Sequence, residues 1–271
     1  MMRKRLFYDK VSFTADTDDI TIIQPRYIHD VHISIQCLQN GATAPSLADI
    51  LSLLDKVQVK LTGKIVTELS GQDILAYNCL VNNRSIKYLV PANDNEVGLV
   101  EGLALPLRLA PGEHVLSLRF LHNSVSTIDT EQLSFSTLES DDVLEDRHIE
   151  MPSFSFTPPS TNAYNTALDS SFTGDVEGFL LYSTTIPTTS SDTATIRKLR
   201  IKAGGDIVYE DNFNNLSAQT YYPEESTLRS ILDNYLYLDF SKNPIAAGTR
   251  IEVEVYSDDT NTVKIIPIVR V

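Results

Sequence analysis

The segment Lys56-Val-Gln-Val-Lys-Leu-Thr-Gly-Lys-Ile-Val-Thr-Glu68 returns 142 residues later as Lys198-Leu-Arg-Ile-Lys-Ala-Gly-Gly-Asp-Ile-Val-Tyr-Glu210. Six of the thirteen paired positions are identical, and two more keep apolar character. Solenoid and propeller repeats recur every ~20–50 residues, so a period of about half the chain indicates another kind of duplication. The repeat predicts two copies of one domain.

Each copy of the repeat has the pattern of a β-hairpin. Val57, Val59 and Leu61 alternate with polar residues, which is the period of a half-buried strand. Leu199 and Ile201 do the same in the second copy. A glycine follows where a tight turn needs positive φ, and a β-branched run comes next. We expect the same hairpin at the same place in both copies.

The later part of each copy predicts a second hairpin. Alternating apolar residues over Leu105–Leu109 are followed by a Pro-Gly turn and by a second alternating run, Leu116–Phe120. In the second copy the runs are Leu236–Phe240 and Ile251–Val255, with a longer turn between them. Copies of a domain diverge first in the lengths of their loops, so this difference is compatible with duplication.

One short helix is expected between the two hairpins of each copy. Ser70-Gly-Gln-Asp73 is a capping-box pattern, and Pro223-Glu-Glu-Ser226 precedes apolar residues at helical spacing. Ser46-Leu-Ala-Asp49 predicts a further helix that only the first copy has. Helix is therefore a minor component of the predicted structure.

The fold class that follows is all-β, with two tandem sandwiches or barrels and short helices between strands. The chain has 271 residues, enough for two domains with cores of their own. The acidic segment Glu139–Asp146, followed by prolines, is the predicted linker. We place the N-terminal domain at residues 1–148 and the C-terminal domain at 149–271, and the resemblance described below implies that each is a jelly roll.

Charge and cysteine content exclude several classes of protein. The net charge of −14 argues against sequence-independent binding of nucleic acid, which needs clustered cations. The one basic cluster is Arg3-Lys4-Arg5, which is either a solvated terminus or a contact with an anionic surface. No apolar run has the length of a membrane span, and no signal-peptide core is present at the N-terminus. We expect Cys37 and Cys79 to be buried thiols, although a bridge between them stays open.

The sequence contains no motif that predicts catalysis, and we assign no catalytic, cofactor-binding or metal-binding residue. His29 and His32 should point to opposite faces of a strand, which is poor geometry for a shared metal. Acidic clusters such as Asp16–Asp19 lack the spacing of an EF-hand, and solvated loop charge explains them better than calcium. Most aromatic residues occupy alternating core positions; Tyr221-Tyr222 and Tyr235 are the exceptions.

This combination resembles the double jelly-roll major capsid proteins of tailless icosahedral viruses, especially the compact type of viruses with an internal membrane. The resemblance rests on the paired hairpins Val57–Glu68 and Leu199–Glu210, the strand Leu232–Phe240 and the closing segment Arg250–Val271. It covers nearly the whole chain, although each element alone is unspecific. The duplication together with the missing chemistry gives it weight.

The resemblance implies a structural capsid subunit that is not an enzyme. It implies homotrimers in which three chains give six barrels in a pseudo-hexagonal capsomer, and a location in the virion after synthesis in the host cytoplasm. The implied partners are neighbouring capsomers, minor capsid and vertex (penton) proteins, and an internal lipid membrane contacted through Arg3, Lys4 and Arg5. No cofactor and no specific nucleic acid are implied.

Two other classes remain in competition with the capsid interpretation. A glycan-directed hydrolase with two jelly rolls would need paired carboxylates and aromatic residues that hold a glycan. A carbohydrate-binding or adhesin β-sandwich would need an aromatic platform on a strand face. The absence of tryptophan argues against both.

Overall fold

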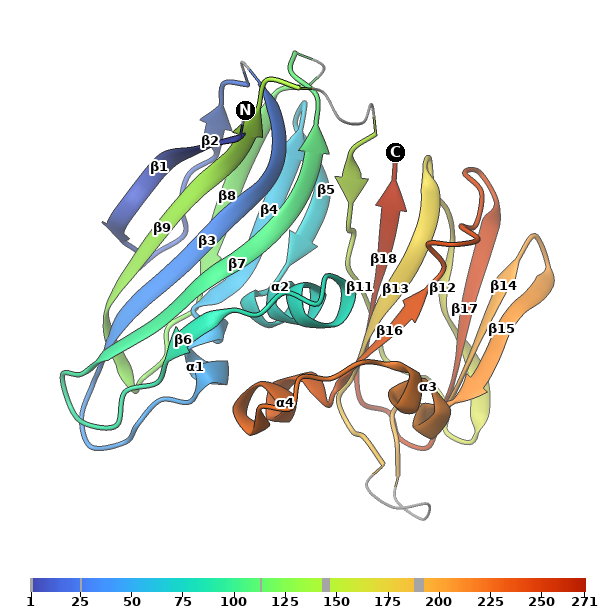
Figure 1. Ribbon diagram of the computed structural model, residues 1–271. Coiled ribbons are helices and arrows are strands. Elements are labelled where there is room, and N and C mark those ends of the chain that lie inside the picture. The colour runs from blue at the N-terminus through green and yellow to red at the C-terminus, as the bar shows by residue number, and fades with distance from the viewer. Residues whose placement is uncertain (1, 25, 113, 143–146, 188–192) are drawn as a thin grey trace. The chain divides into compact units, whose positions relative to one another are not determined.

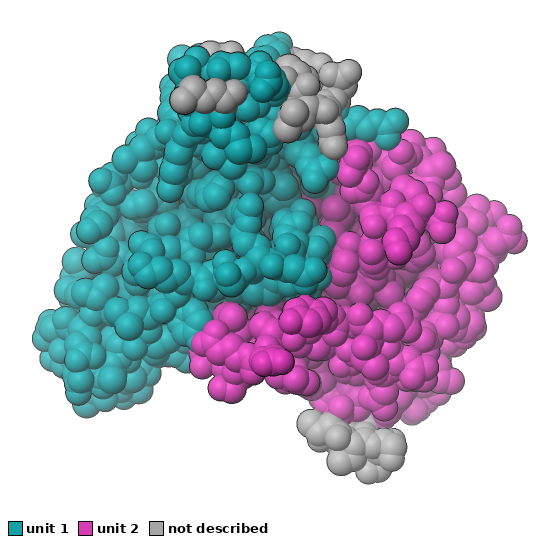
Figure 2. Space-filling model, viewed as in Figure 1, with its two compact units in different colours: residues 1–150 teal, residues 151–271 magenta. Residues whose placement is uncertain are grey.

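The computed structural model describes residues 2–24, 26–112, 114–142, 147–187 and 193–271. The chain divides into two compact units, Met1–Glu150 and Met151–Val271, coloured separately in Figure 2. Strands dominate both units, and all strand pairs in the described part of the chain are antiparallel (Figure 1). The predicted all-β class is confirmed, and the described strands form four sheets.

Unit 1 contains two sheets that bury one face each. Phe120 and Phe135, which belong to different sheets, pack with ring centroids 5.2 Å apart and so mark the core between them. The short strand β10 (Ile149–Glu150) ends the unit. The first sheet has the order β1 (Met2–Ser12), β9 (Ile128–Ser140), β3 (Tyr27–Gln39), β7 (Val97–Leu109) and β6 (Lys87–Leu89). The second sheet has the order β2 (Ile20–Ile22), β8 (Leu116–His122), β4 (Leu54–Leu61) and β5 (Lys64–Leu69).

Unit 2 repeats this strand order. Its core combines side chains of both sheets, such as Phe179 and Leu181 with Val253 and Val255. In one sheet β11 (Phe154–Phe156) pairs with β18 (Val263–Arg270), β18 pairs with β13 (Asp175–Ser183), and β13 pairs with β16 (Tyr235–Asp239). The other has the order β12 (Ala163–Ser171), β17 (Arg250–Ser257), β14 (Lys198–Ala203) and β15 (Asp206–Asn212). Position by position, β1 corresponds to β11 and β5 to β15, so the two units share one topology.

The repeated hairpin is present in both units, as predicted. Thr62 and Gly63 have φ of 50° and 84°, and Gly204 and Gly205 have φ of 61° and 98°. Two consecutive residues with positive φ make the type I′ turn, whose twist matches that of the flanking strands. The register then slips by one residue, at Val66 in β5 and at the equivalent Val208 in β15. The Gly-x-Ile-Val sequence thus encodes a turn followed by a bulge.

The second predicted hairpin is wrong in both units. Strand β7 pairs with β3 and β6, whereas β8 pairs with β2 and β4, so the chain crosses from one sheet to the other between them. Strands β16 and β17 are separated in the same way. Alternation reports only that one face of a strand is buried. In a sandwich both sheets bury their inner faces, so two alternating runs with a turn between them need not pair.

The predicted helices are present. The capping boxes of Ser46 and Ser70 open α1 (Leu47–Ser52) and α2 (Gly71–Ala76), and α4 (Ser226–Leu232) follows the proline-glutamate segment. Two elements were not predicted: the π-helix η1 (Tyr77–Val81), which continues α2, and α3 (Phe213–Gln219), so unit 2 has two helices where one was expected. Both elements are too short to show helical periodicity in the sequence.

The linker prediction begins too early in the chain. Glu139 and Ser140 are the last residues of β9 and are buried, because they pair with both β1 and β3. Residues 143–146 of the predicted linker lie outside the described part of the chain. Cys37 and Cys79 are buried free thiols, as expected, and burial raises the pKa of Cys37 to about 11.

Candidate assembly surfaces

The basic N-terminal cluster is part of an edge strand. Strand β1 pairs only with β9 among the described strands, which leaves its other edge without a strand partner. Phe7 anchors it by stacking on Phe135, with ring centroids 5.4 Å apart. Met2 and Leu6 are exposed on either side of Lys4, at 59% and 57%. The outer side of β1 is therefore an apolar surface with a cation at its centre.

Two of the basic residues near the N-terminus are held by neighbours within unit 1. The guanidinium of Arg5 donates to the carbonyl oxygen of Ile23 at 3.0 Å and lies 4.0 Å from the carboxylate of Glu139. Arg26 donates to Asp141 at 2.5 Å, and this hydrogen bond, with a smaller contribution from Arg3, holds the pKa of Asp141 below its usual value. The charge of this region is therefore largely compensated locally.

The β14–β15 hairpin forms an exposed edge in unit 2. Ile207 and Val208 are 54% and 46% exposed at its tip, next to the exposed carboxylate of Asp206. Soluble proteins usually protect such edges with charge, bulges or covering segments. The bulge at Val208 is one such protection, but the two adjacent apolar side chains remain exposed to solvent.

The equivalent tip in unit 1 is partly covered. Ile65, the counterpart of Ile207, is 44% exposed, whereas Val66, the counterpart of Val208, is only 4% exposed. Val66 lies among Leu61, Leu107, Leu109, His148 and Ile149, so the segment that leaves β9 and forms β10 closes over it. The bulge residue of the repeated hairpin is thus buried in one unit and exposed in the other.

The repeated glutamate is a cross-strand acceptor in both hairpins. In unit 1, Lys56 and Gln58 donate to Glu68 at 2.9 and 2.7 Å. In unit 2, Arg200 stands where Gln58 does and donates to Glu210 at 2.9 Å. These contacts bind the hairpin strands together and account for the recurrence of the glutamate in both copies.

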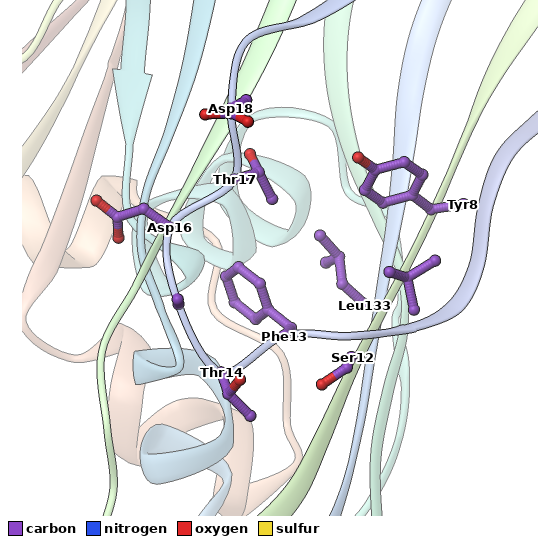
Figure 3. A pocket seen from close by; sticks show the side chains of 10 residues that line it. Tyr8, Ser12, Phe13, Thr14, Asp16, Thr17, Asp18 and Leu133 are labelled. Carbon is purple, nitrogen blue, oxygen red and sulfur yellow. The ribbon is translucent and has the colours of Figure 1, made fainter.

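A hollow in unit 1 lies where the chain passes from β1 to β2. It has a volume of about 300 Å³. Its lining combines apolar and polar side chains: Tyr8, Phe13 and Leu133 with Asp16, Thr17 and Asp18 (Figure 3). Asp16 accepts from the backbone N–H of His122 at 2.9 Å, so it already has a structural role. No group of three or more His, Cys, Asp or Glu side chains with metal-binding geometry occurs among the described residues.

The histidines singled out in the sequence do not converge on one ligand site. His29 contacts Ser140 at 3.1 Å, and His32 lies 3.7 Å from Asp30. The sequence missed the pair formed by His122 and Glu131, whose side chains are 7% and 8% exposed and 2.5 Å apart. Proximity of β8 and β9, which belong to different sheets, creates this pair, and no local pattern signals it.

The aromatic residues flagged in the sequence divide into one exposed ring and two that pack. Tyr235 is buried in β16, and the hydroxyl of Tyr222 donates to its carbonyl oxygen at 2.7 Å. Tyr221 is 67% exposed and lies outside any strand or helix.

In the described residues, no helix combines the length and apolarity that crossing a bilayer requires.

Several solved structures that are similar to this chain are viral capsid proteins. No family model matches the chain, and no curated protein is similar to it in sequence. The major capsid protein of Sulfolobus turreted icosahedral virus superposes with a TM-score of 0.75 at 14% identity, over 100% of this chain and 97% of the other. The major capsid protein P2 of bacteriophage PM2 gives a TM-score of 0.60 at 11% identity, over 100% of this chain and 97% of the other. PBCV-1 VP54, fitted into a reconstruction of the virophage Sputnik, gives a TM-score of 0.60 at 11% identity, over 100% of this chain and 93% of the other. The chain therefore has the double jelly-roll fold of these major capsid proteins.

Proposed function

We propose that this protein is a viral major capsid protein, a structural subunit whose homotrimers form the pseudo-hexagonal capsomers of an icosahedral shell. One observation carries the proposal: the superposition with the turreted icosahedral virus protein spans 100% of this chain and 97% of its relative, with both jelly rolls included. The comparison thus involves the complete two-unit architecture rather than one common β-sandwich.

The internal duplication gives this architecture a geometric use. Three chains with two similar units each present six similar barrels, which fit a hexagonal lattice while the true symmetry stays threefold. On this proposal the further partners are neighbouring capsomers and the minor capsid and vertex proteins. The protein is then made in the host cytoplasm and resides in the virion.

Contact with an internal membrane through Arg3, Lys4 and Arg5 is one candidate role of the N-terminal strand, as an alternative to a contact between subunits. The exposed Met2 and Leu6 beside Lys4 support it, because apolar and cationic side chains together suit an anionic lipid surface. The carboxylates of Glu139 and Asp141 weaken it, since they compensate much of the positive charge.

The hydrolase and the adhesin have no comparable support. The glycan-binding alternatives call for an aromatic platform on a strand face. Tyr221 is the exposed aromatic ring, and it lies in a loop. We therefore propose the capsid role alone.

Light scattering during size-exclusion chromatography tests the proposal directly. A mass three times that of the 30.2 kDa chain is expected, and electron microscopy of concentrated protein should show hexagonal outlines or sheets of them. A protein that stays monomeric at all concentrations, and forms no regular particles in its source preparation, would contradict the capsid role.

A further inference from the structure

The two units share a topology, so the edge strands β1 and β5 of unit 1 can be compared with their counterparts β11 and β15 in unit 2. Strand β1 of unit 1 has eleven residues with four cations and one carboxylate. Its counterpart β11 has three residues, Phe154-Ser-Phe156, and no charge. The edge strand that pairs with β9 in unit 1 is thus long and basic, whereas its counterpart, which pairs with β18 in unit 2, is short and neutral. Duplication alone does not account for this difference.

The opposite edge differs in the complementary sense. Strand β15 of unit 2 carries three carboxylates and no cation, whereas its counterpart β5 carries one of each. At the tip, Asp206 stands where unit 1 has Lys64, and Val208 is exposed where Val66 is buried. Unit 2 has therefore acquired an acidic edge with an exposed apolar tip.

We propose that strand β1 of one copy packs against strand β15 of the next copy, and that this contact joins the subunits of the oligomer. The inference rests on the proposed homo-oligomeric capsid role and names the surfaces involved. The basic strand meets the acidic strand, and the exposed Met2 and Leu6 cover Ile207 and Val208. Complementary charge and mutual burial of apolar side chains are the two ingredients of a specific interface.

Two charged side chains are free to make the contact. Neither Lys4 nor Asp206 has an ion-pair or hydrogen-bond partner for its side chain among the described residues. Arg5, in contrast, is held by Glu139, and Glu210 is held by Arg200. An unpaired cation on one edge and an unpaired carboxylate on the other make Lys4 and Asp206 the natural test pair.

The contact joins two different surfaces, so it is heterologous. A heterologous contact repeats from copy to copy and closes into a ring when the rotation between copies permits. Each copy then uses one basic edge and one acidic edge, so that every β1 and every β15 in the closed ring has a partner. Because the charges are at the surface, salt should weaken the contact.

Charge reversal tests the electrostatic part. Lys4→Glu and Asp206→Lys should each raise the protein concentration at half-assembly roughly tenfold, and the double variant should recover most of the loss. Lys64→Glu, at the equivalent turn position of unit 1, is the matched control and should leave assembly unchanged. Circular dichroism establishes that each variant is folded.

Cysteine cross-linking tests the contact itself. Leu6→Cys and Val208→Cys are placed in separate chains, which are then mixed and oxidised; the native thiols are buried and should not react. A disulfide-linked dimer should form in the mixture and not in either variant alone.

The outcomes separate this inference from the proposed function. The wild-type protein could form trimers while the disulfide does not form and the double variant Lys4→Glu, Asp206→Lys does not recover assembly. In that case the proposed β1–β15 contact is wrong and the proposed capsid role stands. A protein that never assembles would overturn both. If Lys4→Glu leaves the trimer intact and abolishes flotation with phosphatidylserine-containing vesicles, β1 is a membrane contact and this inference fails.

Discussion

Asn78 joins the helical segment of unit 1 to strand β7 through both backbone groups of Ala104. Its side-chain oxygen accepts from the Ala104 N–H at 3.1 Å, and its amide donates to the Ala104 carbonyl oxygen at 2.8 Å. The same amide also donates to the carbonyl oxygen of Ile74 at 2.7 Å. Asn78 is fully buried, and its side chain makes hydrogen bonds to backbone groups of β7 and α2.

Replacement of Asn78 by leucine should destabilise unit 1 by about 2–4 kcal/mol. The substitution leaves the N–H and carbonyl groups of Ala104 buried without these partners, and each such group costs about 1–3 kcal/mol. Urea denaturation followed by circular dichroism measures the loss. Asn123→Ala, at an exposed position, is the control and should change stability by less than about 0.5 kcal/mol. Equal effects of the two substitutions would contradict the role given to Asn78.

Thr62 is the strained residue of the repeated turn. Its φ of 50° suits glycine or asparagine, whereas unit 2 has Gly204 at the same position. Thr62→Asn should therefore stabilise the protein by about 1 kcal/mol, because a β-branched residue disfavours the left-handed region. The reciprocal change Gly204→Thr should cost a similar amount. Thermal unfolding of both variants checks the pair, and a stabilising Gly204→Thr would refute the assignment.

Acid should weaken the β4–β5 hairpin through Glu68. Burial opposes ionisation of this carboxyl, but the hydrogen bonds from Lys56 and Gln58 win and hold its pKa below the ordinary value of 4.5. A lowered folded-state pKa contributes stability above the unfolded value, and that contribution is lost as pH falls through the folded value. The Lys56–Glu68 contact thus contributes more to stability at pH 7 than at pH 3.

Glu68→Gln should cost about 0.5 kcal/mol at pH 7 and less than that at pH 3. Urea midpoints at the two pH values give the comparison. Glu101→Gln removes an exposed pair with Lys87 and should have a smaller effect at either pH. A loss from Glu68→Gln that grows on acidification would have the wrong sign for this mechanism.

Replacing Glu131 alone should lower the stability of the protein more than replacing both Glu131 and His122. Both side chains are almost fully buried, and Phe13 packs edge-on against the imidazole with ring centroids 5.0 Å apart. Glu131→Leu alone leaves the buried imidazole without its partner and should cost about 2–4 kcal/mol. The double variant with His122→Phe should be more stable than Glu131→Leu alone. A double-mutant cycle in urea measures the coupling, and strict additivity would show that the two residues act independently.

The parts of the fold that could be predicted from sequence are those encoded locally. The β4–β5 hairpin follows from alternation and a turn with positive φ, and α1 and α2 follow from their capping boxes. The placement of β7 and β8 in different sheets could not be predicted, because both sheets demand the same alternation. The topology is set by packing across the sandwich rather than by any single segment.

The candidate surfaces were only partly visible in the sequence. Arg3, Lys4 and Arg5 could be recognised as a basic cluster, but their membership of an edge strand depends on β9, more than a hundred residues away. The difference between Val66 and Val208 was hidden, since the repeat shows them as identical residues. Their exposure depends on whether another segment covers the hairpin, as His148 and Ile149 do in unit 1.

The pairing of Met2 with Ser140 sets an order of events during synthesis. Strand β1 leaves the ribosome long before β9, the strand with which it pairs, because most of unit 1 lies between them in the sequence. Contacts between such distant residues slow folding, because a long loop must close before the contacts form. The basic, partly apolar β1 therefore spends the synthesis of unit 1 unpaired, and unit 1 becomes competent to meet another copy only after β9 has closed its sheet.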